Sequence, residues 1–306
     1  MLALLCSHLV VALVALVVIG GVTRVMEAGL ACPDWPLCYG SLLPGRQMNL
    51  QVFLEWFHRL DAFVVGVALL VMLAVSWLRR RDLPAWLPWA ATGALGLVAV
   101  QGALGALTVL HLLDASTVTA HLGTALALVL GMAALHQALL RSSTNAPQPP
   151  PPWPWRLAAL IAGLLVPLQC LLGGAMASRW AAEQCLSQGL DCRWLWLHRL
   201  GAWPAALSLL LLALLSLPLP APQAPLRRFA LLALLLVPAQ VSLGLLTLRL
   251  QLAQPAVTAA HQLLAALLVA LVGALWGRGL LNLPAALGSP AAAVATPSVL
   301  REAFRG

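Results

Sequence analysis

Long runs of apolar residues make up most of the chain, and short polar or proline-rich segments separate them. A helix of about 20 apolar residues crosses the hydrocarbon core of a bilayer. Runs of this length lie at about 2–21, 58–78, 87–110, 117–140, 157–177, 196–217, 229–250 and 257–280. The pattern predicts an all-α fold, a polytopic membrane protein with eight transmembrane helices. The first run lacks the basic start and cleavage site of a signal peptide, so we expect it to remain as a helix.

Composition and charge support a membrane location and orient the helices. Of the 306 residues, 62% are hydrophobic and only 8% are charged, whereas soluble domains carry about 25% charged residues. An even number of spans puts both termini on one side, where ten arginines and two acids give 10 − 2 = +8. Short loops rich in arginine face the cytoplasm. We therefore expect a bacterial inner-membrane protein with cytoplasmic termini. Because the positive charge is spread over loops that flank helices, we expect no nucleic-acid partner.

Two long segments, at about 22–56 and 178–195, fall on the outer side of this topology and hold four of the six cysteines. The outer side of a bacterial membrane is oxidising enough for disulfides to persist. The two cysteines within each segment are close enough in sequence to close a small ring. We predict a disulfide in each segment, Cys32–Cys38 in the first and Cys185–Cys192 in the second.

The chain also contains a repeated unit, which we looked for before assigning a fold. One offset (198 − 58 = 261 − 121 = 140) relates His58-Arg59-Leu60 to His198-Arg199-Leu200, and His121 to His261. The break between the two copies falls in a proline-rich segment that is typical of a stiff, extended linker. We predict two duplicated four-helix bundles: an N-terminal unit at 1–143, a linker at 144–155, a C-terminal unit at 156–281 and a cytoplasmic tail at 282–306.

The four repeated histidines are the strongest candidates for binding a cofactor. Each is expected to open an even-numbered helix at its outer end, so two imidazoles in each half lie at the same depth. Haem iron accepts histidine as an axial ligand, and bundles build such sites between facing helices. Zinc or copper would require further ligands nearby. We predict one haem between His58 and His121 and another between His198 and His261, with iron bound axially, on the periplasmic side.

Neighbouring residues add detail to these sites. Arg59 and Arg199 follow the first histidine of each pair, where they could bind haem propionates. Glu55 stands three residues before His58 on the same side of a helix, and its counterpart in the second half is Leu195. An acid at one site alone predicts proton transfer or stabilisation of positive charge there. The alternative is that Glu55 caps its helix. The stiff segment 29–38 is long enough to form a lid over the first site.

These segments carry a resemblance to a known family. Gly29-Leu30-Ala31-Cys32-Pro33-Asp34-Trp35-Pro36-Leu37-Cys38, Glu55-Trp56-Phe57-His58-Arg59-Leu60 and His121-Leu122-Gly123-Thr124 resemble the haem A synthase family. The resemblance covers nearly the whole chain and all four histidines. The sequence departs from the family pattern around Cys185 and Cys192.

The resemblance implies an oxidoreductase that converts haem O to haem A, by oxidising a methyl group to a formyl group, for use in terminal oxidases. It implies that His58 and His121 hold the substrate haem O, and that His198 and His261 hold a haem b. Glu55 is then a catalytic residue, and Cys32 with Cys38 is important to the lid. The substrate would come from a haem O synthase. The oxidation requires two successive two-electron steps through an alcohol.

Two other functions remain open from the residues themselves. A dihaem cytochrome b that passes electrons would explain the paired histidines, although it gives Glu55 and the lid no purpose. A haem carrier or assembly chaperone would also bind haem without modifying it. The sequence leaves open the electron acceptor, the source of the formyl oxygen and whether the chain forms a homo-oligomer in the bilayer.

Overall fold

The computed structural model describes residues 2–142, 149–176, 185, 187 and 192–281. These residues form no β-strand and eight long helices, each long and apolar enough to cross a membrane. The helices are α1 (Leu2–Val25), α2 (Leu50–Leu78), α3 (Leu87–Leu110), α4 (Ala115–Ser142), α5 (Trp153–Met176), α7 (Arg193–Ser216), α8 (Ala224–Arg249) and α9 (Pro255–Gly279). Two short 3-10 helices, η1 (Gly45–Gln47) and η3 (Ala221–Gln223), lie in the connections. The prediction of an all-α polytopic membrane protein is confirmed.

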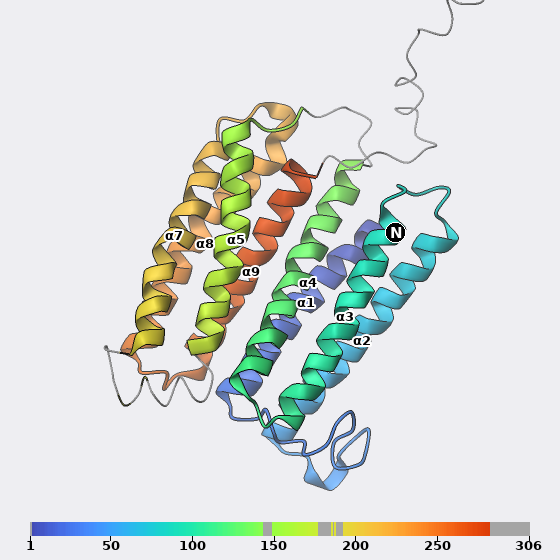
Figure 1. The fold of residues 1–306 in the computed structure, drawn as a ribbon, viewed down its shortest axis with the longest axis vertical. Coiled ribbons are helices and arrows are strands. Elements are labelled where there is room, and N and C mark those ends of the chain that lie inside the picture. Colours follow the sequence, from blue (N-terminus) through green and yellow to red (C-terminus); the bar gives the residue numbers. More distant parts are fainter. Residues whose placement is uncertain (1, 143–148, 177–184, 186, 188–191, 282–306) are drawn as a thin grey trace, which may run out of the picture.

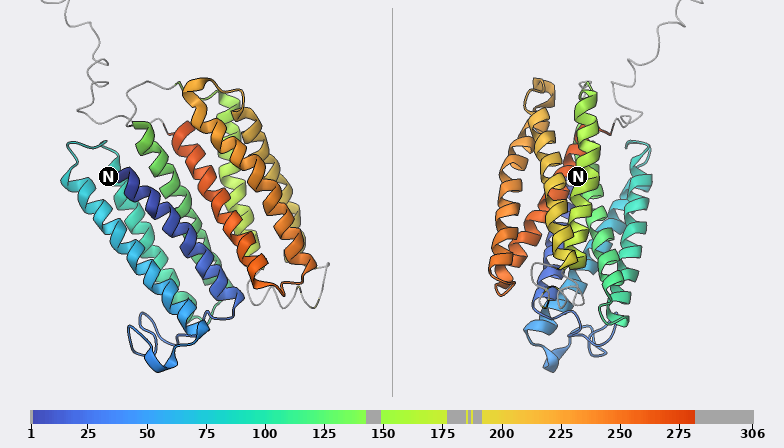
Figure 2. Two further views of the ribbon diagram at one scale, coloured as in Figure 1. Left: turned by 180° about the vertical axis from the view of Figure 1, so that it is seen from behind. Right: turned by 60° about the vertical axis from the view of Figure 1, so that its left-hand side comes forward.

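The helices are arranged as two groups of four that lie side by side (Figures 1 and 2). One group contains α1 to α4, and the other contains α5, α7, α8 and α9. Segment 26–49 and the connections 111–114 and 250–254 lie at one end of the bundle, which we call the loop end (Figure 1). Connections 79–86 and 217–223 lie at the opposite end, which we call the basic end.

A close contact between α4 and α9 joins the two groups. A Cβ atom added at Gly273 of α9 would collide with the carbonyl oxygen of Leu130 on α4, and one at Gly277 would collide with that of Ala134. Small residues four apart let two membrane helices approach until their backbones touch. This contact fixes the two halves relative to each other. The same two helices carry His121 (α4) and His261 (α9).

Several helices begin earlier than the apolar runs suggested. Helix α2 starts at Leu50 instead of near residue 58, because the side chain of Asn49 accepts a hydrogen bond from the Val52 N–H at 3.0 Å and caps the helix. An N-cap side chain satisfies a backbone N–H of the first turn, so a helix can begin in a stretch that is less apolar than the membrane span. The repeated histidines therefore lie five to eight residues inside their helices, so the expectation that each opens its helix was wrong.

The proline-rich linker is shorter than predicted. Residues 143–148 and the tail from 282 to 306 lie outside the described residues, but α5 already begins at Trp153, inside the range 144–155. Trp155 is fully buried, and its indole N–H donates to the Ser216 hydroxyl at 2.8 Å. Because an indole brings large apolar area and a polar N–H that needs a partner, this contact extends the helix into the linker.

Candidate functional site

The four repeated histidines all lie toward the loop end, on α2, α4, α7 and α9. In the first half, the rings of His58 and His121 lie edge to face, with centroids 6.5 Å apart and planes at 76°. Two imidazoles that bind one metal ion from opposite sides, through nitrogens at about 2.0–2.1 Å, have ring centres roughly 6 Å apart. In the second half, His198 and His261 lie close enough to interact electrostatically. The structure thus brings together both predicted pairs.

Three of these histidines carry a buried nitrogen without a partner. The Nδ1 atoms of His58, His121 and His261 are buried and make no hydrogen bond to the described residues. A buried polar atom is normally hydrogen-bonded, and an exception points to a functional role or to a missing ligand or water. Facing imidazoles with spare nitrogens have the donor chemistry that haem iron requires.

Each histidine ring packs against a glycine of a neighbouring helix. A Cβ atom at these glycines would lie 2.9–3.2 Å from the ring carbon Cε1, so any side chain there would displace the ring. The pairs are Gly20 with His58, Gly105 with His121, Gly173 with His198, and Gly244 with His261. The glycines allow each ring to lie close against the adjacent helix.

Glutamines contact three of the four rings. Gln101 lies 3.3 Å from the Nε2 of His121, and Gln240 lies 3.4 Å from the Nε2 of His261. Gln169 approaches His198 at the ring Nδ1 (3.0 Å) and also donates to its backbone carbonyl (2.8 Å). His58 has no such partner among the described residues.

Segment 26–49 folds over the loop end of the first half as a disulfide-closed loop. Cys32 is bonded to Cys38, and both are buried. The start of the loop packs on the α3–α4 connection. A Cβ atom added at Gly29 would lie 3.3 Å from the Leu113 side chain. Its later part is held by Trp56, whose indole N–H donates to the Leu42 carbonyl at 2.6 Å. We call this segment the lid.

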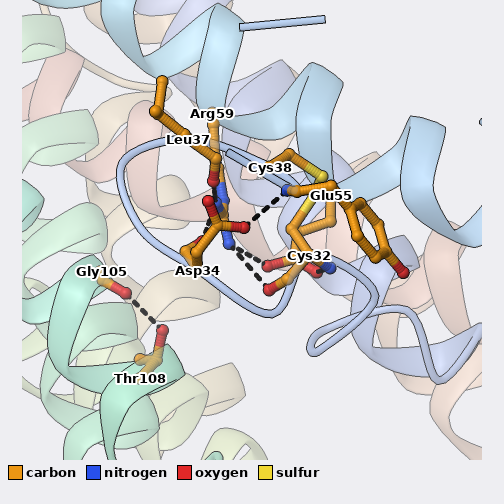
Figure 3. Close-up of polar contacts among 9 residues, drawn as sticks. Cys32, Asp34, Leu37, Cys38, Glu55, Arg59, Gly105 and Thr108 are labelled. Atoms are coloured by element: carbon orange, nitrogen blue, oxygen red, sulfur yellow. Dashed lines mark hydrogen bonds and ion pairs between the residues drawn. A yellow bond between two sulfur atoms is a disulfide. The ribbon is translucent and has the colours of Figure 1, made fainter. Parts of the chain in front are cut away.

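Glu55 and Arg59 form an ion pair on α2, and their hydrogen bonds to the lid backbone tie the lid to this helix (Figure 3). Glu55 is 5% exposed; one carboxylate oxygen accepts from the Cys32 N–H at 2.7 Å, and the other pairs with Arg59. The Arg59 guanidinium also donates to the backbone carbonyls of Asp34, Leu37 and Cys32. Arg59 therefore holds the lid, and its expected contact with a propionate stays a prediction. Asn49 occupies the N-cap of α2, which removes helix capping as a role for Glu55.

Asp34 stabilises the turn at the tip of the lid. Its carboxylate accepts from the backbone N–H groups of Tyr39 at 2.6 Å and Gly40 at 2.8 Å. The hydrogen bond from Gly40, with that from Tyr39 and the charge of Arg59, holds the pKa of the Asp34 carboxyl below its ordinary value. The lid is thus held by a disulfide, by the turn around the Asp34 carboxylate and by Arg59 of α2.

The second half lacks these polar contacts where it is described. Leu195, the counterpart of Glu55, is buried, and Arg199, the counterpart of Arg59, is exposed. Cys185 is bonded to Cys192, but most of segment 177–191 lies outside the described residues. The two halves therefore share the histidines and glycines and differ in the charged groups beside them.

Sequence reasoning missed the glutamines and glycines that position the rings. The signal was available, since Gln101, Gly105 and Thr108 recur as Gln240, Gly244 and Thr247. It pointed to a duplication, but nothing in the spacing said that a glycine faces a histidine of another helix.

Comparison with known proteins adds an independent finding. Residues 2–272 match the COX15-CtaA family model, described as cytochrome oxidase assembly protein. A heme A synthase of Sphingopyxis alaskensis is 30% identical over 262 residues, which cover 66% of this chain and 73% of the relative. A heme A synthase of Caulobacter vibrioides is 31% identical over 196 residues, 53% of this chain and 56% of the relative. A protoheme IX farnesyltransferase of Haloquadratum walsbyi is 33% identical over 123 residues, 37% of this chain and 25% of that protein.

Proposed function

We propose, from the premise that this chain belongs to the COX15-CtaA family of cytochrome oxidase assembly proteins, that it is a membrane oxidoreductase that converts haem O to haem A. Curated relatives that cover most of its length are named heme A synthase. The observation that carries the proposal is the pair His58 and His121, with rings 6.5 Å apart and buried Nδ1 atoms without partners. In the part of the chain that the structure describes, a buried acid and a closed lid stand beside this pair and not beside the other.

In this proposal the first half binds the substrate. His58 and His121 hold haem O by its iron, and the glycines behind them keep the ring planes in place. Oxidising a methyl group to a formyl group adds one oxygen atom and releases protons and electrons in two two-electron steps through an alcohol. The reacting carbon therefore needs a proton acceptor within hydrogen-bond reach, and Glu55 is the buried acid nearest to His58 along α2.

Both oxygens of Glu55 are engaged while the lid is closed. One accepts from the Cys32 N–H and the other pairs with Arg59. Movement of the lid during substrate entry would break the contact with Cys32 and free one oxygen. Glu55 would then take up a proton or stabilise positive charge that develops on the substrate, while Arg59 keeps it oriented.

The second half would bind a haem b between His198 and His261, with Arg199 able to reach a propionate. Haem b supplies one-electron transfer when it is bound. Leu195 gives that site no acid, so it would exchange electrons and perform no proton chemistry. Both sites would face the periplasm, with the termini in the cytoplasm, because the arginine-rich connections lie at the opposite end. A haem O synthase would deliver the substrate, which the similarity to a protoheme IX farnesyltransferase supports.

One experiment separates this function from the two alternatives. The full chain is expressed in cells that make haem O, and the extracted haems are identified by chromatography and mass spectrometry. We expect a formyl-bearing haem that is absent from cells with an empty vector. Haem b alone in the purified protein would instead indicate an electron-transfer cytochrome, and haem O bound and released unmodified would indicate a carrier.

A further inference from the structure

A second polar cluster lies far from the histidines, at the basic end, beside an apolar pocket. The pocket has a volume of about 240 Å³ and lies between α1, α4, α8 and α9. Its walls are apolar and come from both halves of the molecule, including Val10, Ala133, Leu232, Ala270 and Ala274. His136 and Gln137 of α4 supply its polar lining. None of these residues takes part in the site described above.

Arg278 stands one helical turn beyond Ala274, at the basic end of this pocket. Its Nε and Nη1 atoms are buried and have no hydrogen-bond partner among the described residues. Arg141 donates to the backbone carbonyl of Arg278 at 2.9 Å, and its positive charge acts on Arg278. His136 also lies within electrostatic range of Arg278. Three basic side chains from α4 and α9 therefore gather at one point.

No acid in the described part of the chain forms an ion pair with Arg278. Asp82 is the one described acid at the basic end, and it pairs with Arg79 at 3.6 Å, on the α2–α3 connection. Buried cationic nitrogens without a partner are costly. The planar fork of a guanidinium matches the oxygens of a phosphate group. The missing partner is therefore an anion that can accept from Arg278.

We propose that Arg278 and Arg141 bind the phosphate of an anionic phospholipid, and that one acyl chain of this lipid enters the apolar pocket. Basic pockets between transmembrane helices bind anionic head groups in this way. The apolar walls next to the guanidinium favour a lipid over a free anion, because only a lipid satisfies both surfaces at once. The lipid would contact α1 and α4 from one half and α8 and α9 from the other, which makes it a bridge between the halves.

Native mass spectrometry of the full chain in detergent tests the proposal, with phosphatidylglycerol as the probe and phosphatidylcholine as the neutral-head-group comparison. We expect the wild type to retain phosphatidylglycerol preferentially. Arg278→Gln should weaken retention by about fivefold, since a basic residue near a head group contributes about 1 kcal/mol. Arg278→Lys should recover part of it. Arg81→Gln is the matched control, because it removes an exposed charge at the same end away from the pocket.

Two further arms identify the ligand. Ala270→Phe fills the pocket while Arg278 remains, and we expect it to reduce lipid retention as well. Inorganic phosphate at millimolar concentration should leave the bound lipid in place. Displacement by phosphate, or equal retention in wild type and Arg278→Gln with an unchanged helical circular dichroism spectrum, would overturn the proposal. Retention of phosphatidylcholine at the same level as phosphatidylglycerol would also overturn it.

Discussion

The two halves of the molecule repeat a scaffold and differ in the charges placed on it. Each half positions two histidines toward the loop end, and each ring rests on a glycine of a neighbouring helix. Among the described residues, only the first half adds a buried carboxylate, Glu55, and an arginine, Arg59, that is bonded to it and to the lid. In the second half the matching positions are a buried leucine, Leu195, and the exposed Arg199.

In the proposed function, this difference separates a half that binds a haem from a half that also acts on its haem. Ionisable residues inside a membrane bundle are costly and usually serve a function, so our proposal places proton transfer in the half that carries Glu55. The hydrogen bond from the Cys32 N–H also links the acid directly to the lid. The comparison therefore predicts that equivalent substitutions in the two halves have unequal effects.

Removing one of the paired histidines should have the largest effect. His58→Ala should lower haem A formation by at least about 100-fold. Loss of a residue that only supports a metal ligand already lowers affinity or activity by about 10–100-fold. His198→Ala should instead remove the low-spin haem b spectrum. Product is measured by chromatography of extracted haems, and the second site by the absorbance of the reduced protein. A haem b spectrum that persists in His198→Ala would refute the assignment of that site.

Replacing Glu55 should separate binding from chemistry. Glu55→Ala should lower haem A formation by about 10²–10⁴-fold, the usual contribution of a positioned acid or base, while haem content stays near that of the wild type. Leu195→Ala is the matched control in the second half, and we expect it to leave turnover unchanged. Wild-type yield of haem A from Glu55→Ala would remove this residue from the mechanism.

Loosening the lid should have a smaller effect, confined to the first half. Arg59→Gln removes the donor to three lid carbonyls, and hydrogen bonds to charged groups contribute about 1.5–3 kcal/mol. We expect amide hydrogen exchange within residues 26–49 to rise by about tenfold or more. Arg199→Gln, its exposed counterpart, should change no segment. Equal exchange in wild type and Arg59→Gln would mean that the disulfide alone holds the lid.

The sequence predicted the scaffold better than it predicted the contacts within it. Apolar runs placed eight helices, and the shared offset singled out four histidines, of which His58 and His121 were paired by their equal expected depth. The partners of Arg59 were not predictable, since backbone carbonyls of the lid carry no side-chain signal. The charge on Arg278 was read as topology alone, and only the packing of α4 against α9 shows that its Nε and Nη1 are buried without a partner among the described residues.

Adding a methyl group behind a ring should perturb one site moderately. Gly105→Ala places a Cβ 3.2 Å from the Cε1 of His121, whereas Gly102→Ala, one turn earlier on α3, meets open space. Overpacking of this kind costs about 1–3 kcal/mol. We expect Gly105→Ala to weaken haem binding at the first site and Gly102→Ala to leave it unchanged, as measured by haem titration. Similar titrations for both variants would show that the ring does not rest on this glycine.

The smallest expected effect is a pH dependence that the second half should not share. Hydrogen bonds from Gly40 and Tyr39 hold the pKa of Asp34 below its ordinary value, so its contribution to lid stability is complete above that ordinary pKa. The contribution is lost as the pH falls through the lowered pKa of the folded lid. Acidification should therefore increase amide exchange of Tyr39 and Gly40, after correction for the intrinsic rate. Asp34→Asn should exchange faster at neutral pH and lose this dependence, because an amide has no proton to gain in that range. A wild-type lid with no acid transition, or an Asp34→Asn lid that keeps one, would assign the turn to the disulfide and Arg59 instead.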